Sequence, residues 1–345
     1  MDSFAYVFIK LVGERARLMT PEDLAALDQV KTFRDLVAKV REFYPSLGDV
    51  ETLVDLEKAL YEDFFVQFSR IVNASPDRWR QIYLRILAKY ELENLKKIVL
   101  GVIANLPMGE IRALLYEHVE EILGHEKIVT LMLNQKTVEE LLFVLKGYPF
   151  AKPLQEGLAH YQSEGEVFQF QAYVDRYYFQ LLKATRPHLH KACAKVWETY
   201  VGAELERYNL IVLHRGLFNK LAPEFVRGLL VPGGNFLRHA DYLEALVKVK
   251  HDALRDWVVS KFLERGAKPR LVEEAFKDEP NPEVGIWNYY NLFFSEWGRR
   301  EYDLERRTFI TILHFLKMKE SNINHVLRVG VKLVHEINLG VMTVE

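Results

Sequence analysis

The feature that most constrains this chain is a pattern of residues that returns three times along its length. The first copy occupies residues 83–102, YLRILAKYELENLKKIVLGV, where apolar residues recur at steps of three or four. That spacing is typical of an amphipathic helix. Asn94 lies within the apolar stripe, so we expect its amide to be buried and hydrogen-bonded. The stretch therefore predicts a long helix with a polar side chain in its packed face.

The same stretch returns at 204–217 and at 319–333, where Asn209 and His325 take the place of Asn94. Asn209 lies 115 residues after Asn94, and His325 lies 116 residues after Asn209. One third of the 345-residue chain is also 115 residues. The spacing predicts three tandem copies of one unit.

A second marker has the same period. An aromatic pair precedes each copy, and the second members of these pairs are separated by 114 and 115 residues. These second members are Phe65, Phe179 and Phe294. Two independent markers favour a true repeat over three unrelated helices in an aromatic-rich chain. The predicted units are residues 1–120, 121–235 and 236–345.

The rest of the chain is also predicted to be helical, because few stretches alternate with period two. Thr20, followed by Pro21 and two acidic residues, is a typical helix start. The sequence Ser75-Pro76-Asp77 is expected to cap the helix that follows it. Residues 241–263 are expected to form a helix with a break near His251. The fold class predicted is all-α, with three helical lobes.

Bulk properties exclude several classes of protein. The formal net charge is −2, so no overall positive field indicates binding to nucleic acid. Cys193 is the only cysteine, which rules out a disulfide within the chain. No run of about 18 apolar residues is present, and the N-terminus does not have the pattern of a signal peptide. Any association with a membrane is therefore expected to be peripheral.

Motifs for catalysis are missing. Residues 231–235, VPGGN, lack the Lys-Ser/Thr ending of a phosphate-binding loop and are interpreted as a helix connector. His-Glu pairs begin at His125 and His335, but Val129 and Leu339 stand where a zinc protease needs its second histidine. We therefore expect no catalytic residue, no cofactor and no metal.

Two further groups have some of the character of a site. His188, His190 and Cys193 are possible metal ligands, but their spacing directs the side chains apart on a helix, and no further ligand completes a site. Two arginine pairs flank Tyr302 and suggest either a patch for an acidic partner or a solvated helix face balanced by nearby acids. The pairs are Arg299-Arg300 and Arg306-Arg307.

Several segments together resemble one family, the funnel-shaped helical subunit of V-type and archaeal A-type rotary ATPases. It is called the d subunit in eukaryotes and the C subunit in archaea and bacteria. The segments are FAY at 4–6, RARL at 15–18, YLR at 83–85, LENL at 92–95, DRYYF at 175–179, YNL at 208–210, VPGG at 231–234, and Lys319-Glu320 with Ile323. The chain departs from the family pattern at His325, where Asn is usual, and at Asn322, where an acid is usual.

The resemblance implies three lobes around a pseudo-threefold axis, forming a funnel. It implies a noncatalytic central-stalk rotor protein that links the shaft to the membrane ring of proteolipids, for torque transmission and ion transport. The protein would lie at the cytoplasmic face of the membrane. The alternative from the residues alone is an all-helical scaffold that binds other proteins, although such arrays usually repeat every 30–50 residues. A helical enzyme with buried carboxylates would need paired Glu-x-x-His motifs, which are missing.

Overall fold

The computed structural model describes residues 3–165, 167–185, 188–297 and 304–342. Within these ranges the chain is helical and contains no strand, which confirms the all-α prediction. The helices are α1 (Ser3–Arg15), α2 (Pro21–Leu27), α3 (Phe33–Val40), α4 (Leu53–Ala74), α5 (Asp77–Ile103), α6 (Met108–Ala113), α7 (Glu117–Leu123), α8 (Glu126–Leu133), α9 (Val138–Val144), α10 (Ala151–Glu164), α11 (Val167–Ala184), α12 (Lys191–Phe218), α13 (Pro223–Leu229), α14 (His239–Lys248), η1 (His251–Ala253), α15 (Leu254–Glu264), α16 (Pro269–Phe276), α17 (Pro282–Trp297) and α18 (Leu304–Met342).

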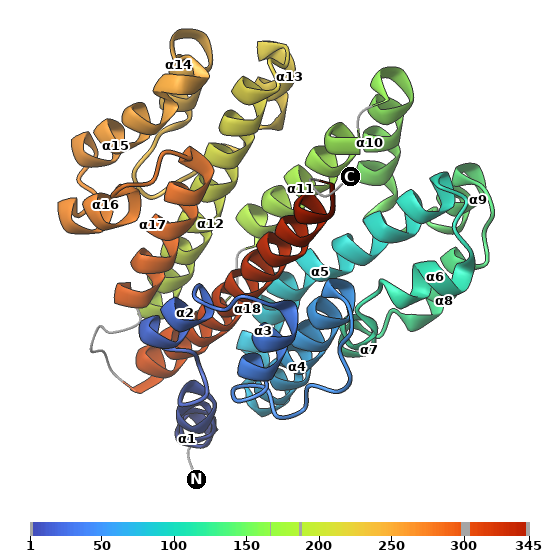
Figure 1. The fold of residues 1–345 in the computed structure, drawn as a ribbon, viewed down its shortest axis with the longest axis horizontal. Helices are drawn as coiled ribbons and strands as arrows, with labels where there is room; N and C mark the ends of the chain where they lie inside the picture. Colours follow the sequence, from blue (N-terminus) through green and yellow to red (C-terminus); the bar gives the residue numbers. More distant parts are fainter. Residues whose placement is uncertain (1–2, 166, 186–187, 298–303, 343–345) are drawn as a thin grey trace.

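The longest of these helices, α5, α12 and α18, contain the three copies of the sequence pattern. They run from the lower edge of Figure 1 toward its upper side. Each is preceded along the chain by another helix that packs against it: α4 before α5, α11 before α12, and α17 before α18. Residues 200–210 of α12 and 308–317 of α18 are buried without interruption, so these helices are covered on every side. They form the core of the molecule.

The helix pairs contact one another in a closed order. Helix α5 of the first pair packs on α11 of the second, and α12 of the second packs on α17 of the third. Helix α18 of the third pair then packs on α4 of the first. Three units that touch in this order form a ring. The pseudo-threefold arrangement of the lobes, their superposition and their boundaries stay predictions.

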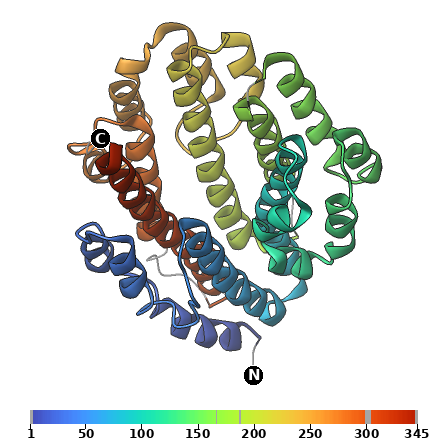
Figure 2. The same cartoon turned by 45° about the vertical axis from the view of Figure 1, so that its right-hand side comes forward.

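Short helices cover the outer side of each long helix. Helices α6 to α9 pack on α5, and α13 and α14 pack on α12. The helices that cover α18 come from the other end of the chain: α1, α2 and α3 lie beside it, as Figure 2 shows. The start of the first predicted unit therefore packs against the third.

Of the helix starts and breaks predicted from local sequence, the start at Thr20 and the break near His251 are confirmed, and the cap at Ser75 is not. Thr20 caps α2 as expected: its side chain accepts from Asp23 N, and the Asp23 side chain accepts from Thr20 N. The break near His251 is confirmed, because α14 ends at Lys248 and a short 3-10 helix follows. The expected cap at Ser75 is wrong. Its hydroxyl donates to Ile71 O at 2.6 Å and so ends α4, while α5 begins without a side-chain cap.

Candidate functional site

The three long helices meet at a cluster of buried charges, here named the central ion cluster. Glu204 and Arg207 belong to α12, Lys317 and Glu320 to α18, and Lys89 to α5. The first four are 6% exposed or less, whereas the Lys89 side chain is 30% exposed. Charged residues are rarely buried to this degree unless they are paired. The centre of the three helices is thus joined by ion pairs within a largely apolar core.

Lys317 connects the two carboxylates. Its Nζ lies 2.8 Å from Glu204 Oε1 and 2.7 Å from Glu320 Oε2. Arg207 Nη2 donates to Glu204 Oε2 at 2.7 Å, and Lys89 pairs with Glu320 Oε1. Burial opposes ionisation of Glu320, but Lys317, Lys89 and Arg207 together hold its pKa well below the usual range. Burial likewise opposes ionisation of Glu204, but Arg207 and Lys317 lower its pKa, so both carboxylates are ionised.

The cluster has a regular register along the long helices. One charged residue lies five positions before an asparagine in each helix: Lys89 before Asn94, Glu204 before Asn209, and Lys317 before Asn322. Arg207 and Glu320 each lie two positions before the same asparagines. Equivalent positions of the three helices thus supply most of the charges.

The asparagines of the first two repeats make the same contact. Asn94 Nδ2 donates to Tyr116 O at 3.0 Å, and Tyr116 N donates to Asn94 Oδ1 at 2.9 Å. Asn209 makes the same pair of bonds with Val231, at 2.8 and 2.9 Å. Both partners lie 22 residues after their asparagine, and both asparagines are 0% exposed. Each amide therefore ties a long helix to the chain that follows it.

A second contact repeats beside the first. Gly101 on α5 faces Ile111, and Gly216 on α12 faces Val226. In both cases a Cβ added to the glycine would lie 2.6 Å from the facing side chain. Only glycine allows this close approach. The short helices therefore rest directly on the backbone of the long ones.

In α18, the amide contact belongs to Asn322. In the orientation of the amide that gives both of its polar atoms a partner, Oδ1 accepts from Met19 N at 2.8 Å and Nδ2 donates to Met318 O at 3.0 Å. His325 is half-buried, and its Nε2 lies 3.1 Å from Asp28 Oδ1. Asn322 thus contacts backbone atoms, as Asn94 and Asn209 do in their own helices. That His325 superposes on them stays a prediction.

The aromatic markers lie around the same centre. Phe65 packs edge-on against Tyr90, with ring centroids 5.0 Å apart, and Phe179 stacks on Tyr208 at 4.2 Å. Phe294 lies 5.8 Å from the ring of Tyr200. Lys317 Nζ lies 5.6 Å from the Phe294 centroid, which adds an aromatic face to the ion cluster. All three markers are buried.

Other residues considered from the sequence are not brought together. Cys193 is buried, while His188 and His190 are exposed. Arg299 and Arg300 lie outside the described residues, as does Tyr302. For Arg306 and Arg307 the structure describes the helix but not the side chains. The VPGGN segment is a connector between α13 and α14, and Asn235 fixes it to α12 by donating to Thr199 O at 2.9 Å.

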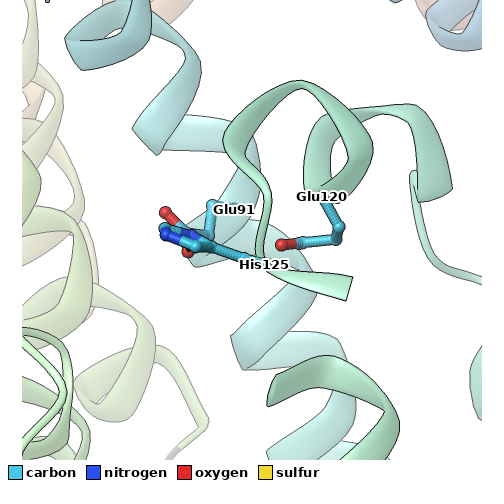
Figure 3. Close-up of side chains that lie close together, drawn as sticks. All are labelled: Glu91, Glu120 and His125. Atoms are coloured by element: carbon cyan, nitrogen blue, oxygen red, sulfur yellow. Dashed lines mark hydrogen bonds and ion pairs between the residues drawn. The ribbon is translucent and has the colours of Figure 1, made fainter. Parts of the chain in front are cut away.

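A group of possible metal ligands could not be found from sequence motifs. Glu91, Glu120 and His125 each offer one ligand atom, and these atoms lie within 4.8 Å of one another (Figure 3). Burial raises the pKa of Glu91 to about 8 and the pKa of Glu120 to about 7. No motif connects these residues, because they come from α5, α7 and the turn before α8. The His125-Glu126 pair has only the first two residues of the zinc-protease motif.

The fold and its centre define a class: an all-helical protein in which three long helices share a buried ion cluster. The chain belongs to the ATP synthase (C/AC39) subunit family, whose model matches residues 10–329. Among its relatives is the A-type ATP synthase C subunit of Thermococcus kodakarensis, 23% identical over 80% of this chain and 75% of the relative. The corresponding C subunit of Methanocaldococcus jannaschii is 25% identical over 64% of this chain and 56% of the relative.

Family membership makes the chain a noncatalytic subunit of a rotary ATPase, with other subunits of that complex as partners. In the described part of the chain, none of the helices is both long enough and apolar enough to cross a membrane.

Proposed function

We propose that this protein connects the central shaft of a rotary ATPase to the proteolipid ring, and that it transmits torque between them. It would bind the ring from the cytoplasmic face of the membrane. The observation that carries this proposal is the closed order of contacts among α4, α5, α11, α12, α17 and α18, in a chain of this family.

Torque transmission requires that the part between shaft and ring resist twisting. In an open row of helices, the end units have one neighbour each and can rotate away. In the closed order seen here, each helix pair packs on two others, and the contact between α18 and α4 joins the last pair to the first. The central ion cluster adds a second connection between α5, α12 and α18. Both features support a rigid adapter.

The charge balance supports docking through local complementarity. The net charge of −2 gives no strong overall electrostatic field. Partners would therefore be recognised by local charged patches at the two ends of this protein's ring of helices. Binding through such exposed charges weakens with salt. We therefore expect association with the proteins of the shaft to be salt-sensitive.

The test is to compare membranes with and without this protein. Removal is expected to leave ATP hydrolysis by the catalytic head and to abolish ATP-driven ion pumping. Adding back the purified chain should restore pumping. ATP-driven pumping that persists in membranes shown to lack the protein would contradict the proposal.

A further inference from the structure

A second candidate site lies away from the central ion cluster, where the short helices α7 and α8 meet α5. Glu91 belongs to α5, Glu120 to α7, and His125 immediately precedes α8. Figure 3 shows Glu120 pointing from α7 toward the other two side chains. The three ligand atoms lie within 4.8 Å of one another, so one ion could contact all three after small side-chain rotations.

Both carboxylates are almost completely removed from solvent. Glu91 and Glu120 are each 3% exposed. Glu120 Oε1 accepts a hydrogen bond from Asn94 Nδ2 at 2.8 Å, but its Oε2 is buried without a hydrogen-bond partner. A buried carboxylate oxygen without a partner is costly, and it is usually satisfied by a donor or by a metal ion. The Oε2 atom of Glu120 can therefore accept a further ligand.

We propose that Glu91, Glu120 and His125 form a binding site for a divalent transition-metal ion such as Zn²⁺. Two carboxylates supply the charge that balances a divalent ion, and His125 Nδ1 supplies a nitrogen ligand. An imidazole together with carboxylates suits Zn²⁺ and its first-row neighbours. Mg²⁺ and Ca²⁺ prefer sites made of oxygen atoms alone, so they are expected to bind more weakly.

The surroundings have the features of a metal site. Asn94 holds Glu120 through the hydrogen bond to Oε1, which leaves Oε2 to face the ion; such outer contacts orient metal ligands. The side chain of His125 is 32% exposed, which gives a path for the ion from solvent. Binding must replace the hydrogen bond between His125 Nδ1 and Glu91 Oε1, now 2.5 Å. The bound ion would tie α7 and the start of α8 to α5.

Helix α7 also carries a matched control. His118 Nδ1 pairs with Glu62, and His118 Nε2 lies 3.9 Å from Glu121 Oε2. The two carboxylates therefore approach opposite nitrogens of the ring, and one ion cannot bind both of them together with His118. This group has the same composition as the proposed site but not its geometry.

The experiment uses the full chain, freed of metal with a chelator and then titrated with Zn²⁺ by calorimetry, with the thermal midpoint followed in parallel. We expect one ion per chain and a midpoint that rises with Zn²⁺ concentration. The double variant Glu91→Gln/Glu120→Gln should bind at least about 100-fold more weakly, because removing only outer contacts already costs 10–100-fold. The Gln side chains keep the size of Glu and preserve the acceptor for Asn94, so the variant is expected to fold.

His125→Gln should also lose binding, whereas the control His118→Gln should bind like the native chain. Circular dichroism of the metal-free forms checks that all variants fold. The proposal is overturned if the native chain shows no stoichiometric binding, or if the double variant binds Zn²⁺ as tightly as the native chain. Mg²⁺ binding as tight as Zn²⁺ would overturn the assignment to transition metals.

Discussion

At the scale of single residues, the clearest determinant is the buried asparagine that ties a long helix to the following segment. Replacing Asn209 by Leu leaves the N–H and C=O of Val231 buried without partners. We predict a loss of about 1–3 kcal/mol in the free energy of unfolding. Urea denaturation measures it. The control Asn219→Leu changes an exposed amide at the end of the same helix and should have little effect. Equal midpoints for both variants would contradict the prediction.

Glu206 is a residue whose ionisation should affect stability. It is fully buried on α12 and accepts hydrogen bonds from Phe236 N at 2.9 Å and from Tyr290 Oη at 2.8 Å. Burial nevertheless raises its pKa from 4.5 to about 7. Between these two values the folded chain holds more protons than the unfolded chain, so this group's contribution to stability falls as the pH rises.

The predicted change for Glu206 is on the order of 3 kcal/mol across that window. Other groups titrate too, so the useful measurement is the difference in unfolding free energy between Glu206→Gln and the native chain. We expect this difference to shift in favour of the variant as the pH rises from about 5 to 7. A difference that stays constant with pH would show that the carboxyl does not titrate in this range.

At the scale of helices, the central ion cluster connects α5, α12 and α18 through buried ion pairs. Replacing Lys317 by Met would leave Glu204 and Glu320 buried without the cation between them. Removing one partner of a buried ion pair typically costs about 3–5 kcal/mol. We predict a loss of this size in the unfolding free energy. The control Lys248→Met breaks a pair on the surface of α14 and should cost less than about 1 kcal/mol.

A milder variant separates charge from shape at Lys317. Lys317→Arg changes the shape of the side chain but keeps its positive charge between Glu204 and Glu320. It should therefore lose less stability than Lys317→Met. If Lys317→Met and Lys248→Met are equally stable in denaturant titrations, the buried cluster does not contribute in the way that its geometry indicates.

The sequence predicted the helices better than their contacts. The helices could be inferred from the local spacing of apolar residues. The burial of Asn94 and Asn209 could be inferred because each lies within an apolar stripe, where a polar side chain needs a hydrogen-bond partner. The central ion cluster could not, because Lys317 and Glu320 look like a solvated i,i+3 pair until α12 covers them. The metal-ligand group was missed for a similar reason: Glu91 and His125 are 34 residues apart and share no motif.

At the scale of the whole molecule, the packing of the N-terminal helices on α18 was also outside what periodicity can predict. Closing a ring brings together residues from opposite ends of the chain, as when Asn322 meets Met19. The repeat predicts three similar units, but their order in space depends on which surfaces fit. The short helices that cover α18 therefore come from the N-terminal segment rather than from the chain next to it.

Ring closure predicts how the molecule unfolds. A chain of 345 residues made of independent domains would unfold in several steps. Here each helix pair packs on both others, so loss of one exposes the cores of the rest. We therefore predict that far-ultraviolet circular dichroism and tryptophan fluorescence report one coincident transition in urea. Separate transitions for the two signals would show that the units are independent.

A variant at the closing contact tests this cooperativity directly. Gly330 of α18 is buried against α4 and α3: a Cβ there would lie 2.6 Å from Leu53 and 3.5 Å from Leu36. Gly330→Leu should therefore overpack the closing interface and cost about 1–3 kcal/mol. Gly228→Leu is the control, because nothing lies within 4 Å of its added Cβ. If the ring is one cooperative body, Gly330→Leu lowers the midpoint of the single transition for both signals equally. If it splits that transition while Gly228→Leu does not, closure joins units that are stable alone, and the rigidity expected of a torque-bearing adapter must come from its partners.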